Sequence, residues 1–138
     1  MGHKAHPKSM RLGYIIKDWD SKWFNLKEMP NFIEEDYRIR TYVRNNLKQA
    51  SISKILIERA GDYLKVNICT ARPGIVIGKG AQGVENIRKE LENMTDRKTT
   101  VNVLEIKKPE LDAYLVAEGI AYQLEKQIAF RRAMKKSI

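Results

Sequence analysis

The sequence predicts an α+β fold in which a helix, two strands, a second helix and a third strand follow one another. Three observations lead to this order. Apolar residues recur with helical spacing in some segments, they alternate with polar residues in others, and glycine or proline separates neighbouring segments. The chain has 138 residues, which fits one domain or one domain with part of another. The expected elements are helix 33–49, strands 51–59 and 63–71, helix 82–94 and strand 99–106.

The first helix is indicated by an apolar stripe, because Ile39, Val43 and Leu47 recur at every fourth position. The acidic run 34–36 lies near the expected start of this helix, where the positive end of the helix dipole favours carboxylates. The stripe predicts a helix that packs one side on the strands.

The two strands that follow are predicted to form a hairpin. Ile55 and Ile57 alternate with more polar neighbours in the first strand, and Leu64 and Val66 do so in the second. The dipeptide Gly61-Asp62 lies between them and is typical of a tight turn. This pattern predicts that the isoleucine, leucine and valine side chains share one buried face.

The charge of the chain is concentrated at its two ends. The formal net charge is +9, and residues 1–17 and 126–138 carry basic residues but no acidic ones. The middle of the chain is therefore neutral. A neutral body with basic ends favours a polyanionic partner such as RNA, whose phosphates the cations neutralise. Solubility alone is the alternative, but it does not require segregated charge. The candidate RNA contacts at the N-terminal end are Lys4, Lys8 and Arg11.

Residues 1–30 are expected to form an irregular basic arm, because glycine and proline interrupt them and few are apolar. Trp19, Trp23 and Phe24 stand among polar residues in this arm. They either stack on bases or, as such residues do more often, attach the arm to its own domain.

A glycine-rich segment, 78–83, matches the pattern G-x-G-x-x-G. Dinucleotide binding would require a strand that runs directly into the loop within a β-α-β unit. Here Pro73-Gly74 interrupts the strand, and a hairpin precedes the loop. A phosphate loop of the Walker type is also excluded, because Val84 and Glu85 follow Gly83 where lysine and serine or threonine would be needed.

Another interpretation fits this segment better, since Ile75–Ala81 resembles the I-I-G-x-x-G signature of KH domains. The resemblance implies a type II KH domain whose loop lets an RNA backbone approach a helix N-terminus. The second glycine of the signature falls on Ala81 in this chain. The loop glycines therefore either contact RNA or only permit a tight turn. The candidate RNA contacts here are Arg72, Gly78, Lys79 and Gly80.

A third long helix is expected from Pro109, which suits a first helical turn, to the basic segment Phe130–Lys136. Its apolar side would lack most of its packing partners, so we expect it to begin a second domain that is otherwise absent. The expected domain organisation is an arm at 1–30, a type II KH domain at 31–107 and this helical segment at 108–138.

Four blocks in the same order resemble the bacterial-type family of small-subunit ribosomal protein S-three. They are Met1–Lys4 with Pro7, Arg11–Gly13 and Trp19; Thr70–Lys79; Lys108–Ala113; and Phe130–Lys135. The resemblance implies that Arg131, Arg132 and Lys135 face messenger RNA, and Lys136 is added on charge alone. A helix C-terminus that attracts cations is the structural alternative for this block.

The same resemblance implies a structural role in the head of the small ribosomal subunit. The expected partners are small-subunit ribosomal RNA, messenger RNA at the entry channel and neighbouring ribosomal proteins of families ten and fourteen. The expected location is a bacterial-type ribosome, cytoplasmic or organellar. The alternative function is that of a free-standing KH regulator of messenger RNA or a ribosome-assembly factor.

No enzyme, cofactor or metal site is expected. His3 and His6 are the only histidines and both lie in the arm, so no metal-ligand set or catalytic set is complete. Cys69 is the only cysteine, and at a strand end it is expected to be a packing residue. No membrane segment is expected either, because no run approaches about 18 apolar residues.

Overall fold

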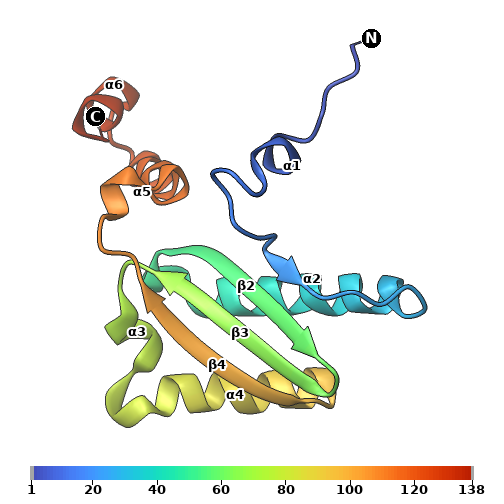
Figure 1. Cartoon of the computed structure of the whole chain (residues 1–138). Coiled ribbons are helices and arrows are strands. Elements are labelled where there is room, and N and C mark those ends of the chain that lie inside the picture. Colours follow the sequence, from blue (N-terminus) through green and yellow to red (C-terminus); the bar gives the residue numbers. More distant parts are fainter. Residues whose placement is uncertain (1, 138) are drawn as a thin grey trace.

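The computed structural model describes residues 2–137, apart from the side chain of Lys79. Its strands form one sheet in the order β1-β2-β3-β4, with two long helices across one face (Figure 1). The strands are β1 (Ser21–Lys22), β2 (Ile52–Ala60), β3 (Tyr63–Thr70) and β4 (Lys98–Glu105), and the covering helices are α2 (Met29–Asn46) and α4 (Gln82–Thr95). The predicted α+β order of helix, strand, strand, helix and strand is confirmed.

The strand pairing follows from the connections. β2 and β3 are antiparallel, with Ile57 opposite Val66, as expected for a hairpin that turns at Gly61-Asp62. β3 and β4 are parallel, with Val66 opposite Val101, because α4 carries the chain back along the sheet. The short strand β1 adds to the other edge in parallel with β2.

The core lies between the sheet and the two helices. Ile57 and Val66 are fully buried on the sheet, Ile39 is fully buried on α2, and Leu91 is fully buried on α4. These are the positions that the period-two and helical patterns marked as apolar. The opposite face of the sheet carries Lys54, Leu56 and Glu58 along β2 in the alternate register.

The N-terminal arm is not wholly irregular. It contains the one-turn helix α1 (Pro7–Arg11) and strand β1, which places the arm along the sheet edge. α2 begins at Met29, four residues before its predicted start, and Pro30 occupies its first turn, where a missing N–H costs nothing. Short helices that the sequence did not predict are η1 (Lys48–Ala50), α3 (Pro73–Ile77) and η2 (Lys79–Ala81).

The prediction of a single helix from Pro109 to Lys136 is wrong. The structure has a short turn η3 (Pro109–Leu111), then α5 (Ala113–Glu125) and, after a break, α6 (Phe130–Ser137). At the break Gln127 adopts a left-handed conformation with φ of 60°, and its N–H donates to the carbonyl of Leu124 at 2.9 Å. No proline or glycine marks this turn, so the apolar spacing alone could not reveal it.

No helix between residues 2 and 137 combines the length and the apolar character that crossing a membrane requires.

Candidate nucleic-acid interface

Helix α6 carries a dense group of basic residues. Four of its residues are basic and none is acidic. The helix contacts α5 (Figure 1), and Ala133 is its buried residue. Successive helical residues are rotated by about 100°, so Arg131 and Lys135 lie on the side opposite Ala133. Arg132 and Lys136 lie on one flank of that side. The helix therefore turns Arg131 and Lys135 away from the buried side of α6 and leaves Arg132 and Lys136 exposed on its flank.

None of these four cations forms an ion pair within the part of the chain that the structure describes. The side chains of Arg131, Arg132, Lys135 and Lys136 are exposed. Unpaired cations on one helix repel one another and do little for the fold, whereas a phosphate backbone would neutralise them. The four residues named from the sequence thus form one outward-facing surface.

The position of α6 depends on how α5 is attached to the sheet. Asp112 is the N-cap of α5: its Oδ1 accepts hydrogen bonds from the N–H groups of Tyr114 and Leu115 at 3.0 and 3.3 Å. Its other oxygen accepts a hydrogen bond from the hydroxyl of Ser53 at the start of β2. The guanidinium of Arg44 on α2 also lies 5.3 Å from the ring centroid of Tyr114. These contacts fix the base of α5, and through it α6, on the KH-like body.

The carboxylate of Asp112 provides a pH-dependent test of this attachment. Burial acts to raise its pKa, but the hydrogen bonds from Ser53 and from two backbone N–H groups outweigh burial and lower the pKa below the ordinary value of 3.8. Because the folded pKa is lowered, the stabilisation is present above the ordinary value and is lost as pH falls through the folded pKa.

We therefore expect Asp112→Ala to lower the free energy of unfolding by about 1 kcal/mol at neutral pH, as for other lost N-caps. The difference from the unchanged chain should narrow as the pH falls below 3.8. Chemical denaturation followed by circular dichroism at several pH values measures it. Glu110→Ala is the control, since this exposed carboxylate makes no capping contact. A difference that stays constant with pH would contradict this role for Asp112.

The glycine-rich loop joins α3 to α4 through a sharp turn. Gly78, Gly80 and Ala81 all have positive φ, of 69°, 60° and 62°, and Ala81 caps α4 in this left-handed conformation. A Cβ on Gly83 would lie 2.5 Å from the carbonyl oxygen of Val76. The glycines are therefore needed for the tight turn, which is one of the two interpretations the sequence left open. The other, contact with RNA, is compatible with Gly80, which is exposed and has no neighbour within 4 Å of an added Cβ.

Of the other predicted contacts at the loop, Arg72 is exposed at the N-cap of α3. The side chain of Lys79 lies outside the described residues, so its predicted contact stays a prediction.

Fewer cations of the N-terminal arm are available to RNA than the sequence indicated. Lys4 is exposed, but the ammonium group of Lys8 pairs with the carboxylate of Asp20. Arg11 donates to the carbonyl of Pro7 at 3.2 Å and remains exposed.

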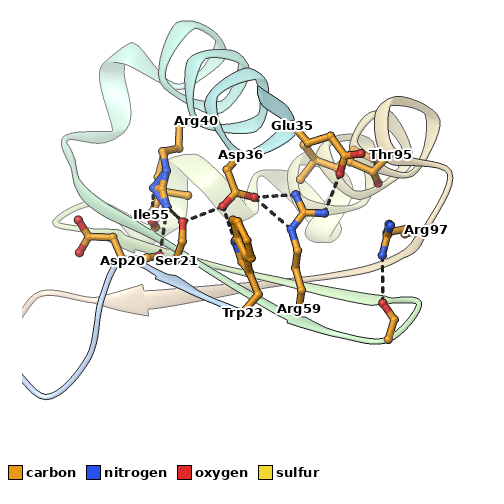
Figure 2. Close-up of polar contacts among 12 residues, drawn as sticks. Asp20, Ser21, Trp23, Glu35, Asp36, Arg40, Ile55, Arg59, Thr95 and Arg97 are labelled. Atoms are coloured by element: carbon orange, nitrogen blue, oxygen red, sulfur yellow. Dashed lines mark hydrogen bonds and ion pairs between the residues drawn. The ribbon is translucent and has the colours of Figure 1, made fainter. Parts of the chain in front are cut away.

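A buried polar network, which the sequence did not predict, attaches the arm to the domain (Figure 2). Asp36 on α2 accepts hydrogen bonds from Trp23 Nε1 at 2.9 Å and from the hydroxyl of Ser21 at 2.7 Å. Arg59 on β2 forms ion pairs with Asp36 and Glu35 at 2.6 Å each. Glu35 and Asp36 of the acidic run at 34–36 therefore serve this network, whereas Glu34 pairs with the exposed Arg38. The helix itself starts earlier, at Met29. Trp23 attaches the arm and is not free to stack on a base.

The remaining aromatic and titratable residues do not form a second site. Trp19 packs against His6 with ring centroids 5.8 Å apart, whereas Phe24 is exposed. Burial raises the pKa of the Cys69 thiol, which disfavours the reactive thiolate. Between residues 2 and 137 no three histidine, cysteine, aspartate or glutamate side chains gather in a way that could hold a metal ion.

The fold and the loop together define the class. The order helix, strand, strand, helix and strand, with a glycine loop directly before the second long helix, is that of a type II KH domain. The sequence profile of the KH domain matches residues 38–111, and the chain belongs to this family.

More specific relatives match the chain from end to end. It is 73% identical over 138 residues to Small ribosomal subunit protein uS3 of Endomicrobium trichonymphae, of which it covers 59%. It is 55% identical to uS3 of Anaeromyxobacter sp. strain Fw109-5 and 54% identical to uS3 of Enterococcus faecalis, covering 61% and 63% of those proteins. The resemblance to the S-three family is confirmed, and the chain spans about three fifths of the length of these curated relatives.

Proposed function

We propose that the chain is a structural component of the small ribosomal subunit that binds small-subunit ribosomal RNA. The observation that carries the RNA contact is the set of four exposed cations on α6, none of which forms an ion pair within residues 2–137, next to a type II KH domain. The ribosomal assignment is supported by the relatives, which are small ribosomal subunit proteins and match all 138 residues. The location that follows is the ribosome, in the cytoplasm of a bacterial cell or in an organelle.

The finer proposal concerns messenger RNA. Arg131, Arg132 and Lys135, with Lys136 beside them, would face messenger RNA where it enters the subunit. Their outward direction on α6 supports this role, because a mobile strand needs a surface that the protein itself leaves unoccupied. Any unwinding would be passive: cations that bind the phosphates of single strands stabilise the open form, and no nucleotide hydrolysis is involved.

The chain is proposed to act without catalysis or a cofactor. Its contribution is electrostatic and structural: the sheet and its two helices hold the glycine loop, and α5 holds the basic helix. A ribosomal function also predicts contacts with neighbouring small-subunit ribosomal proteins of families ten and fourteen. The segment 108–138 would begin a second domain, and the exposure of Leu111, Tyr122 and Leu124 supports further protein packing there.

Removing two of the α6 cations tests the RNA contact. We expect Arg131→Ala with Arg132→Ala to weaken binding to RNA and to flatten its salt dependence. Each lost phosphate contact lowers the slope of log K against log salt by roughly one, so the pair should lower it by about two. Fluorescence anisotropy with a labelled RNA at several salt concentrations measures both quantities.

The matched control is Lys89→Ala with Lys98→Ala, two exposed lysines on α4 and at the start of β4 that carry the same total charge. The control should change the slope much less. If the α6 variant keeps the slope of the unchanged chain, α6 does not contact phosphate and the proposal is wrong.

A further inference from the structure

A buried residue, Thr70, joins several segments at one end of the sheet. Thr70, the last residue of β3, is fully buried, and its hydroxyl donates to the carbonyl of Ala50 in η1. The same hydroxyl oxygen accepts from the N–H of Arg72 at 3.0 Å, and the Thr70 carbonyl accepts from the N–H of Ile106 at 2.9 Å. Three segments that are distant in the sequence therefore meet at Thr70.

Each of these three segments carries exposed cations within two residues of its hydrogen bond to Thr70. Lys48 lies two residues before Ala50, Arg72 is itself tied to Thr70, and Lys107 and Lys108 follow Ile106. We name these four residues the sheet-end cations. None of them forms an ion pair among residues 2–137, and the exposed acids on the same segments, Glu105 and Glu110, form none either. The basic residues outnumber those acids by two.

Local structure explains only part of this arrangement. Lys48 follows the C-terminus of α2, where the helix dipole favours a cation. Lys107 and Lys108 precede η3 in a non-helical linker, so no helix C-terminus accounts for them. Like charges on segments that the fold ties together repel one another, which makes a purely stabilising role a poor explanation. A polyanion that binds there would offset the repulsion.

The sheet-end cations adjoin, along the chain, the two regions that are proposed to bind RNA, the glycine loop and α6. α3 and the glycine loop follow directly after Arg72, and α3 contacts both η1 and β4. On the other side, Lys107 and Lys108 lead into η3 and α5, which carries α6. Figure 1 shows this end of the sheet with α3 on one side and α5 and α6 on the other.

We propose that the sheet-end cations form an additional phosphate-binding surface for RNA, which connects the glycine loop with α6. This inference rests on the proposed function, because it requires an RNA ligand. The ligand chemistry is that of an RNA phosphate backbone, which ribosomal RNA and messenger RNA share. The hydrogen bonds of Thr70 fix the backbone of the three segments, so only the side chains of the cations have to order when RNA binds.

The test is the triple variant Lys48→Ala, Lys107→Ala and Lys108→Ala, made in the full 138-residue chain. Arg72 is left unchanged because it lies at the N-cap of α3. Binding is measured by anisotropy across a salt series with two probes, an unstructured single-stranded oligoribonucleotide and small-subunit ribosomal RNA. The slope of log K against log salt should fall by about two for the single strand, at about 0.7 per lost contact, and by at least as much for ribosomal RNA.

The control triple variant is Lys27→Ala, Lys89→Ala and Lys98→Ala, which removes the same charge from exposed sites elsewhere. A fall in slope for the sheet-end variant alone supports the surface. A fall with both probes shows that the surface binds RNA phosphates in general, and a fall with ribosomal RNA alone identifies ribosomal RNA as the ligand. An equal fall in both triple variants overturns the proposal, because net charge would then explain the effect. An unchanged slope, while Arg131→Ala with Arg132→Ala still lowers it, overturns this surface and leaves the proposed function standing. A chain with no salt-dependent RNA binding at all overturns both.

Discussion

Replacing Arg59 by methionine is expected to lower the free energy of unfolding by about 3–5 kcal/mol. The Arg59 side chain is only 3% exposed and forms ion pairs with Glu35 and Asp36 at 2.6 Å each. Its guanidinium also lies 4.6 Å from the ring centroid of Phe32. Methionine would fill much of the space, but it cannot neutralise the carboxylates.

The size of this effect comes from the charge that is left behind. The side chain of Asp36 is 7% exposed, so without Arg59 its carboxylate would be buried without a cation. Trp23 and Ser21 would still donate to it, but they carry no charge. The arm is attached through the same carboxylate, so we expect β1 to loosen as well. Urea denaturation followed by circular dichroism measures the loss.

Arg38→Met is the matched control, because Arg38 also pairs with a glutamate, Glu34, but both side chains are more than 60% exposed. An exposed pair contributes about 0–1 kcal/mol, so this variant should be nearly as stable as the unchanged chain. The double variant Arg59→Met with Asp36→Asn should lose less than Arg59→Met alone, since the most buried unpaired charge is removed. Glu35 still loses its partner, but its side chain is 27% exposed. Equal stability of the Arg59→Met and Arg38→Met variants would show that the buried network does not stabilise the fold.

Replacing Gly83 by alanine is the second large effect that the structure predicts. The added Cβ would lie 2.5 Å from the carbonyl oxygen of Val76 and 3.0 Å from that of Ile77. Both are backbone atoms of α3, so the clash is relieved only if α3 and α4 move apart. Overpacking of this kind costs about 1–3 kcal/mol, and we expect a value near the upper end, about 3 kcal/mol.

Gly119→Ala is the matched control for Gly83→Ala, because it adds the same methyl group to another helix. Gly119 lies within α5, and an added Cβ there would meet nothing within 4 Å. Gly119→Ala should therefore stabilise the chain by up to about 1 kcal/mol, the ordinary gain in helix propensity. Thermal unfolding of both variants should shift the melting temperature in opposite directions. If Gly83→Ala is as stable as Gly119→Ala, the close approach of α3 to α4 is not as described.

The regular elements could be predicted from the sequence because their signals are local. The alternation around Gly61-Asp62 and the stripe through Ile39 and Val43 depend only on neighbouring residues, and the structure buries the residues they mark. The glycines of the G-x-G-x-x-G match form the tight turn between α3 and α4, since a Cβ on Gly78 would lie 3.2 Å from the nitrogen of Gly83.

The features that the sequence could not reveal depend on contacts between distant residues. Asp36 and Arg59 are 23 positions apart, so nothing local distinguishes Asp36 from an acidic residue at a helix start. Lys8 counted as a free cation because residues 1–17 contain no acidic residue, yet Asp20, later in the same arm, pairs with it. The meeting of three segments at Thr70 likewise depends on the sheet register.

The central claim, that the chain is a component of the small ribosomal subunit, is tested most directly in cells. A tagged form of the 138-residue chain would be expressed in bacteria, and the lysate would be separated on a sucrose gradient after a high-salt wash. We predict that the chain sediments with small subunits and remains there after the wash. A chain that binds RNA but stays at the top of the gradient would contradict the claim and would favour a free-standing KH regulator.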